Sequence, residues 1–267
     1  MRDSSDTHSA DPVPEAAGAQ MITSIVRGDG VRDELAVEEP LEIRVDGDPL
    51  AVTMRTPGHD EELALGFLAG EGLIEATRTV GPTADFAANV IEVAGPLLRQ
   101  PGQRRFYTTS SCGVCGKGAL EEVAVHAPRA RPGPVVGRRL LGELPDRLCQ
   151  PAFERTGGLH ATGLFSSAGE AIVVREDVGR HNAMDKVIGR ALMDGRLPLS
   201  GRVVCVSGRL SFELVQKAAV AGAPVLVGVG APSSLAIELA ADRGMTVCGF
   251  AGGGTVNVYT GSDRVSA

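Results

Sequence analysis

Two cysteines separated by two residues, Cys112 and Cys115, are the side chains of this chain best suited by type and spacing to chemistry. They lie in the string Ser-Ser-Cys-Gly-Val-Cys-Gly-Lys (residues 110–117), between a predicted strand and a predicted helix, and a glycine follows each cysteine. The unpaired N–H groups and positive dipole of a helix N-terminus favour a thiolate over a thiol, and Lys117 adds a positive charge. A thiolate is the species that attacks a persulfide, so the pattern favours sulfur transfer or redox chemistry.

Metal binding and a structural role are the alternatives for this pair. A structural zinc site needs two more ligands, best supplied by a second close pair. The other cysteines, Cys149, Cys205 and Cys248, are isolated in or near apolar stretches, which predicts core cysteines. A zinc deaminase carries a proline before its Cys-x-x-Cys, whereas Ser111 precedes Cys112 here. The residues favour sulfur or redox chemistry and leave the other two roles open.

Composition excludes several classes of protein. The 267 residues are 43% hydrophobic and carry a net charge of −7, with 3% aromatic residues and no Trp. A nucleic-acid partner is not expected, because phosphate backbones select basic surfaces and single strands select aromatic faces. No apolar run reaches the 18 residues of a membrane span, and the polar first 20 residues lack the apolar core of a signal peptide. Five cysteines form no disulfide framework, so we expect a protein of the reducing cytoplasm.

Hydrophobic patterning predicts a disordered tail (1–20), an N-terminal α+β domain (21–105) and a larger α/β domain (106–267). In the first domain, residues 41–45 alternate as a strand, Asp46-Gly47-Asp48 predicts a hairpin turn, and 50–54 form the return strand. Asp60 or a neighbour caps a helix that ends near Gly70 or Gly72.

The larger domain begins with a strand over 106–109, continues through the cysteine string and a helix, and passes an exposed loop over 127–137. From residue 170 the chain alternates strands with helices. Strands are predicted over 171–174, 203–206, 225–229, 245–248 and 255–259, and helices over 182–193, 212–221 and 233–243. Continuous apolar strands separated by helices predict a sheet covered on both faces.

Other strings could bind polar ligands. Five ionisable residues crowd Arg-Glu-Asp-Val-Gly-Arg-His-Asn (175–182), which could orient the His181 imidazole for proton transfer, or could be a solvated loop with Asn182 as helix cap. Glycine-containing loops follow three strands, at 207–209, 228–234 and 250–255. If they converge at one sheet edge, they would make a site for a nucleotide-like ligand. His160 has no partner identifiable from sequence, which favours a core or loop histidine.

Taken together, these strings resemble the formate dehydrogenase accessory sulfurtransferase (FdhD) family over about residues 22–261. The resemblance is carried, in order along the chain, by Glu-Glu-Pro-Leu-Glu-Ile (38–43), Met-Arg-Thr-Pro-Gly (54–58), Gly-Phe-Leu (66–68) with Glu71-Gly72, Ser-Ser-Cys-Gly-Val-Cys-Gly (110–116), the string 175–182, and Ser-Gly-Arg (207–209). The number and order of these strings make the match more specific than a lone Cys-x-x-Cys.

The resemblance implies a sulfur carrier that takes sulfur from a cysteine desulfurase as a persulfide. It would pass that sulfur to the bis(molybdopterin guanine dinucleotide) molybdenum cofactor, as cargo, before the cofactor enters formate dehydrogenase. By position, Cys112 would bear the persulfide, Cys115 would be its companion thiol, and the cofactor would contact Phe250, Ala251, Gly252, Gly253, Gly254 and Thr255. The family also implies a cytidine-deaminase-like α/β core, a homodimer and no permanently bound metal.

One departure from the family is visible in the cofactor loop. The family usually carries basic residues near the positions of Gly252 and Thr255, and this chain has none there. Backbone N–H groups of the triple glycine, or Arg175, Arg180 and Arg209, could supply the missing interactions with phosphate. A cofactor-binding chaperone whose cysteines are incidental, and a zinc-dependent deaminase, are the competing functions.

Overall fold

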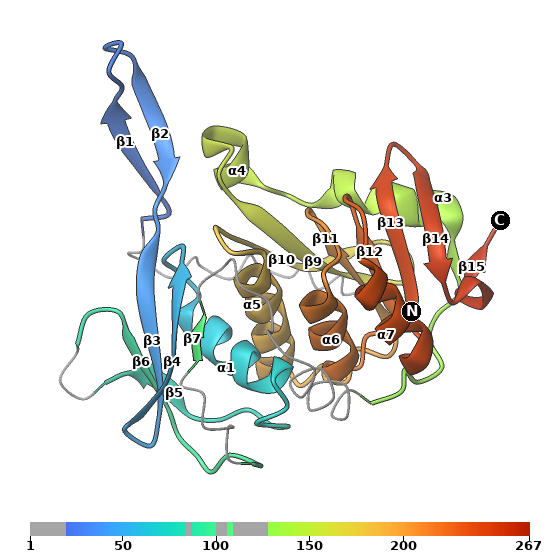
Figure 1. Ribbon diagram of the computed structural model, residues 1–267, viewed down its shortest axis with the longest axis horizontal. Helices are drawn as coiled ribbons and strands as arrows, with labels where there is room; N and C mark the ends of the chain where they lie inside the picture. The colour runs from blue at the N-terminus through green and yellow to red at the C-terminus, as the bar shows by residue number, and fades with distance from the viewer. Residues whose placement is uncertain (1–19, 84–86, 100–105, 109–127) are drawn as a thin grey trace, which may run out of the picture.

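The computed structural model describes residues 20–83, 87–99, 106–108 and 128–267. It is a mixed α/β structure with two main sheets (Figure 1). The predicted α/β class is therefore confirmed, while kinship with cytidine deaminases stays a prediction.

The first sheet has five strands in the order β5-β6-β3-β4-β7. At its centre, β3 and β4 form the predicted hairpin, in which Asp46 and Gly47 both adopt the positive φ that a tight two-residue turn requires. The alternating burial of β3 places every second side chain in the core. The strands are β3 (Glu39–Val45), β4 (Asp48–Arg55), β5 (Val80–Pro82), β6 (Val90–Val93) and β7 (Phe106–Thr108).

The second sheet has six strands in the order β10-β9-β11-β12-β13-β14. Its central strands β11, β12 and β13 run parallel, and β9 and β14 are antiparallel to their neighbours β11 and β13. The strands are β9 (His160–Ser166), β10 (Ala171–Asp177), β11 (Arg202–Val206), β12 (Val225–Gly228), β13 (Thr246–Gly252) and β14 (Thr255–Thr260).

Helices cover both faces of the six-stranded sheet, as predicted (Figure 1). Buried residues of α5 (Arg180–Met193), α6 (Phe212–Val220) and α7 (Ser234–Arg243) pack on one face. Those of α3 (Arg138–Glu143) and the following 3-10 turn η1 (Leu144–Arg147) pack on the other. The side chains of Ser211 and Ser233 cap α6 and α7.

Helix α1 (Asp60–Gly70) packs directly on α5 and joins the two sheets through one continuous core. The helix backbones touch at two glycines. A Cβ at Gly66 would lie 1.7 Å from the carbonyl oxygen of Asp185, and one at Gly189 would lie 1.8 Å from that of Glu62. Only glycine permits this approach.

A hairpin of β1 (Ile22–Val26) and β2 (Arg32–Ala36) projects from the body (Figure 1). Exposed apolar side chains lie along it, namely Ile25, Val26, Val31 and Leu35. The hairpin contacts α4 (Pro151–Thr156) of the main body. One of these contacts is the exposed ion pair between Arg155 of α4 and Glu34 of β2.

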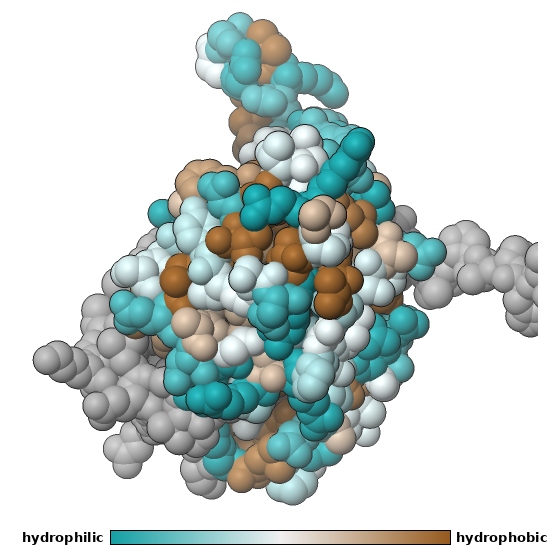
Figure 2. Space-filling model, turned by 90° about the vertical axis from the view of Figure 1, so that its right-hand side faces the viewer, coloured by the Kyte–Doolittle hydropathy of each residue, from teal (hydrophilic) through white to brown (hydrophobic). Residues whose placement is uncertain are grey.

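The C-terminal edge of the molecule is formed by β14 and by β15 (Val265–Ser266), which follows the short turn η2 (Ser262–Arg264) and pairs with β8 (Val136–Gly137). Viewed from this side, apolar residues gather between hydrophilic ones (Figure 2). Val229, Phe250 and Tyr259 are exposed large apolar side chains in the region of β12–β14. No helix in the described ranges combines the length and apolarity of a membrane span.

Two sequence-based expectations need correction. Cys149 is exposed rather than in the core, although Cys205 and Cys248 are buried as predicted. The residue at the cap position of α5 is Gly179, not Asn182. For α1 the cap position is held by His59, a neighbour of Asp60 as predicted, although its side chain makes no capping hydrogen bond. The division into domains stays a prediction; strand β7, which lies just after the suggested boundary between residues 105 and 106, pairs with β4 in the first sheet.

Candidate functional site

Two loops and one strand meet at the carboxyl edge of the parallel strands. Val229 N donates to Val206 O at 3.2 Å, Gly230 N donates to Gly208 O at 3.0 Å, and Phe250 N donates to Gly230 O at 3.3 Å. These bonds join the loops that follow β11 and β12 to each other and to Phe250 in β13. The carboxyl edge of parallel strands is where α/β proteins bind ligands.

His160 lies at the same edge, although the sequence offered it no partner. It opposes Asp177 across the β9–β10 pair, and a Cβ at Gly208 would lie 3.5 Å from its Nδ1. Burial lowers the pKa of His160, and the positive charges of Arg180 and His181 lower it further. The ring is therefore mainly neutral at pH 7 and sits among cationic neighbours.

His181, at the start of α5, is paired rather than solvated. Its Nε2 lies 2.8 Å from Glu213 Oε2 and 3.4 Å from Ser211 Oγ, and its side chain is 18% exposed. The hydrogen bond from His181 lowers the pKa of Glu213, which keeps that carboxylate ionised. A carboxylate that fixes an imidazole is the arrangement used to orient a proton-transfer group.

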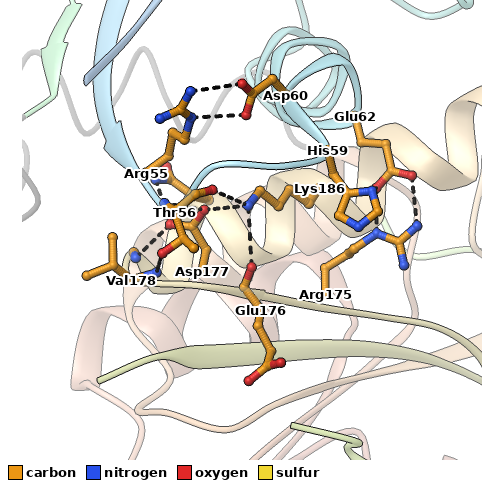
Figure 3. A network of polar contacts seen from close by, with 12 residues as sticks. Arg55, Thr56, His59, Asp60, Glu62, Arg175, Glu176, Asp177, Val178 and Lys186 are labelled. Carbon is orange, nitrogen blue, oxygen red and sulfur yellow. Dashed lines mark hydrogen bonds and ion pairs between the residues drawn. The ribbon is translucent and has the colours of Figure 1, made fainter. Parts of the chain in front are cut away.

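Asp177 is the centre of a buried network (Figure 3). Its carboxylate accepts from Thr56 N, Gly179 N and the Asn182 amide at 3.2, 2.8 and 3.1 Å, and lies 2.7 Å from Lys186 Nζ. Lys186 also donates to the carbonyl oxygen of Thr56 at 2.9 Å. Four donors saturate the buried carboxylate, and the network locks the end of β4 to the start of α5.

Two of the remaining ionisable side chains of residues 175–182, those of Arg175 and Glu176, also have structural partners. The Nε of Arg180 is buried and has no hydrogen-bond partner among the described residues. Arg175 forms a two-pronged pair with Glu62, at 2.6 and 2.8 Å (Figure 3). The Glu176 carboxylate accepts from the first backbone N–H groups of α4, at Ala152 and Phe153. Arg175 is therefore held in an internal ion pair with Glu62 and is no longer a candidate for binding phosphate.

Cys112 and Cys115 lie outside the described residues, but the strand leading to them is placed. The backbone of β7 runs parallel to β4, with Thr108 opposite Thr53. Thr53 Oγ1 donates to Asn182 Oδ1 at 3.0 Å, next to the Asp177 network.

The predicted cofactor loop, Phe250 to Thr255, comprises the end of β13, a two-residue turn at Gly253 and Gly254, and the start of β14. Phe250 has a φ of 52°, is 53% exposed and belongs to the carboxyl edge. Ala251 is buried. Beyond it, Gly253 and Gly254 take positive φ, and Thr255 Oγ1 donates to Gly252 O at 2.9 Å. The end of the turn lies against α3, where Gly254 N donates to Gly142 O at 3.2 Å.

The string His59-Asp60-Glu61, which the sequence-based prediction missed, matches the His-x-Glu of zinc deaminases. His59 lies beside the Arg175–Glu62 pair, with Nδ1 3.7 Å from Glu62 Oε2 (Figure 3). Burial and the charge of Arg175 lower its pKa, so the ring is neutral, as a metal ligand must be. The adjacent guanidinium opposes a cation, and the described residues contain no cluster of three or more potential metal ligands.

Comparison with known proteins agrees with the motifs that the structure brings together. Residues 36–266 match the model of the FdhD/NarQ family. The chain is 54% identical over 252 residues to the sulfur carrier protein FdhD of Streptomyces coelicolor, covering 88% of this chain and 89% of that protein. It is 50% identical over 255 residues to the protein of the same name from Mycobacterium tuberculosis, with 88% and 92% covered.

A solved structure has the same fold. A crystal structure from Desulfotalea psychrophila, of a chain described as a candidate formate dehydrogenase accessory protein, matches with a TM-score of 0.71 and 26% identity. The match covers 95% of this chain and all of that one. With a family match from residue 36 to residue 266 and relatives half identical over most of its length, the chain belongs to the FdhD/NarQ family.

Proposed function

We propose that this chain carries sulfur on Cys112 from a cysteine desulfurase to the bis(molybdopterin guanine dinucleotide) molybdenum cofactor, in the cytoplasm. Membership of a family whose relatives are named sulfur carrier proteins supports the sulfur-carrier role in general. The observation that supports the finer proposal is the Cys112-Gly-Val-Cys115 string itself, a glycine-flanked thiol pair that begins four residues after β7 in the sequence.

Loading is a thiolate exchange. The Cys112 thiolate attacks the terminal sulfur of the desulfurase persulfide; one S–S bond forms, the other breaks, and the desulfurase thiolate leaves. The sulfane sulfur moves without a change in oxidation state, so this step needs no oxidant.

Release can then use Cys115. Its thiolate attacks Sγ of Cys112, which expels HS⁻ and leaves a Cys112–Cys115 disulfide. Two thiol sulfurs are oxidised while the sulfane sulfur is reduced to sulfide, so the released atom can become a metal ligand without oxidising the metal. A dithiol reductant of the cytoplasm must restore the pair for another cycle.

Reconstitution of formate dehydrogenase tests this function. Enzyme matured in cells lacking the endogenous carrier should regain activity with the wild-type chain and not with Cys112→Ala. Cys149→Ala is the matched control, because Cys149 is the exposed cysteine of the described residues and should be dispensable. Full activity with Cys112→Ala would disprove sulfur carriage by Cys112.

The same assay distinguishes sulfur carriage from the alternative function, that of a cofactor-binding chaperone. That alternative is favoured by the carboxyl edge, where the loops after β11 and β12 meet Phe250 of β13 regardless of the cysteines. A chaperone with incidental cysteines would activate formate dehydrogenase as the double variant Cys112→Ala/Cys115→Ala. A sulfur carrier would not.

We also propose that the protein acts as a homodimer. The β1–β2 hairpin supports this, because an isolated two-stranded hairpin is marginally stable in water and this one exposes Val26 at 65% and Val31 at 50%. Light scattering after size exclusion should give twice the chain mass of 27.6 kDa. A monomer at micromolar concentration would contradict the proposal.

A further inference from the structure

A cavity of about 460 Å³ lies between the β13–β14 turn and the α3–η1 segment. Gly253 and Gly254 of the predicted cofactor loop form one side. The other side is formed by four charged residues that the sequence did not single out, namely Arg139, Glu143, Asp146 and Arg147.

The packing of the turn against α3 is enforced by a glycine. A Cβ at Gly142 would lie 2.4 Å from both the carbonyl carbon of Gly254 and the backbone nitrogen of Thr255. Together with the hydrogen bond from Gly254 N to Gly142 O, this close approach fixes the position of the loop relative to the arginines of α3 and η1.

A single carboxylate bridges the two arginines. Arg139 Nε donates to one oxygen of Glu143 at 2.8 Å, and Arg147 Nη2 donates to the other at 3.2 Å. The Arg139 side chain is 87% exposed, while Arg147 also donates to the carbonyl oxygen of Gly169 at 2.9 Å. A phosphate offers more acceptor oxygens than a carboxylate. Two guanidinium groups that share the Glu143 carboxylate beside a cavity can therefore share a phosphate in its place.

We propose that Arg139 and Arg147 bind a phosphate of the guanine dinucleotide cofactor, with Glu143 displaced as their shared acceptor. This inference rests on the proposed function. It explains how a loop with no basic residue between Phe250 and Thr255 can face an anionic cargo: the cations come from α3 and η1 instead. The Glu143 carboxylate competes with the ligand and keeps the arginines paired when the site is empty.

GDP is the probe, because it presents the guanosine and the diphosphate of the cofactor without the metal. Isothermal titration should show Arg139→Ala binding GDP about tenfold more weakly than wild type, the effect of losing one charge-assisted contact. Glu143→Gln, which removes the competing charge, should bind GDP more tightly. The matched control is Arg155→Ala, since Arg155 is also an exposed arginine paired with a glutamate, on α4.

A rescue variant makes the test specific to charge. A Cβ at Gly252 would meet nothing within 4 Å, so Gly252→Lys fits the fold and restores a cation to the loop. In the Arg139→Ala background it should recover GDP affinity. Unfolding curves of each variant separate loss of affinity from loss of fold, and Arg139 makes no described side-chain contact other than that with Glu143.

Unchanged GDP affinity in Arg139→Ala, weaker binding in Glu143→Gln, or no GDP binding by the wild type would each overturn the inference. Sulfur loading provides an independent readout. If wild type and Arg139→Ala both fail to take up sulfur on Cys112 while the GDP results hold, the proposed sulfur function fails and the phosphate site stands.

Discussion

Asp177 and Lys186 form a 2.7 Å ion pair in which both side chains are completely buried. The pair lies where β4 ends and α5 begins, two segments about 120 residues apart in the sequence, and it also engages the backbone of Thr56. The pair therefore fixes the end of β4 against the start of α5.

Removal of one partner should be costly. Lys186→Met leaves the Asp177 carboxylate buried without its counter-charge, and we expect the free energy of unfolding to fall by about 3–5 kcal/mol. Urea denaturation followed by circular dichroism measures this. Arg155→Ala, which breaks an exposed pair, is the control and should cost no more than about 1 kcal/mol. Equal effects of the two variants would show that the buried pair has no special role.

The close contact between α1 and α5 predicts that adding one methyl group at Gly66 destabilises the protein. Gly66→Ala would place Cβ against the carbonyl oxygen of Asp185, and we expect a loss of at least about 2 kcal/mol despite the better helix propensity of alanine. Gly201→Ala is the control, because that Cβ would have no atom within 4 Å. Thermal and urea unfolding of both variants would decide the matter; a Gly66→Ala protein as stable as wild type would contradict the close contact.

The environment of His160 predicts a pH dependence of stability. Its pKa in the folded protein is below the ordinary value of 6.5, so the unfolded chain binds the proton more readily. Stability should therefore decrease as the pH falls below about 6.5. His160→Asn should lose less free energy of unfolding than wild type between pH 7 and pH 5.5. Parallel pH profiles for the two proteins would rule out a depressed pKa.

The cysteines of the described residues should differ in reactivity. Cys149 is exposed and should be alkylated in the native protein. Burial raises the pKa of the Cys205 thiol and raises that of Cys248 to about 12, so neither should react until the protein unfolds. Iodoacetamide labelling at pH 8 with peptide mapping tests this. Rapid native labelling of Cys205 would contradict its place in the core.

Zinc content tests whether His59 acts as a ligand. The Arg175 guanidinium next to the ring disfavours a cation, and we expect purified protein to hold far less than one zinc per chain. Elemental analysis by mass spectrometry measures the ratio. One zinc per chain that is lost in His59→Ala would instead favour a zinc site shared with the cysteine pair.

Local patterns in the sequence predicted local structure well. Alternation and the Asp46-Gly47 turn located the β3–β4 hairpin, and Gly244 marked the end of α7, where it adopts the left-handed conformation. Patterning also indicated the helix-covered sheet. These features depend on neighbouring residues, so a single sequence is enough to reveal them.

Long-range contacts could not be predicted in this way. Asn182 was a candidate helix cap, but its amide bonds to Met54, which lies 128 residues away. The segment from Val136 to Ser166 forms short elements rich in arginine, proline and glycine, which have no clear periodicity, so α3, η1, α4 and β9 were missed. Arg139 and Arg147 were missed as site residues for the same reason, because they meet Gly253 and Gly254 only in the folded chain.

The mass of the sulfur-loaded protein tests the central claim most directly. After incubation with a cysteine desulfurase and cysteine, the intact chain should gain about 32 Da, one sulfur atom, and lose it on treatment with a thiol reductant. The gain should persist in Cys115→Ala and Cys149→Ala and be absent from Cys112→Ala. An adduct that persists in Cys112→Ala and disappears in Cys115→Ala or Cys149→Ala would contradict Cys112 as the carrier.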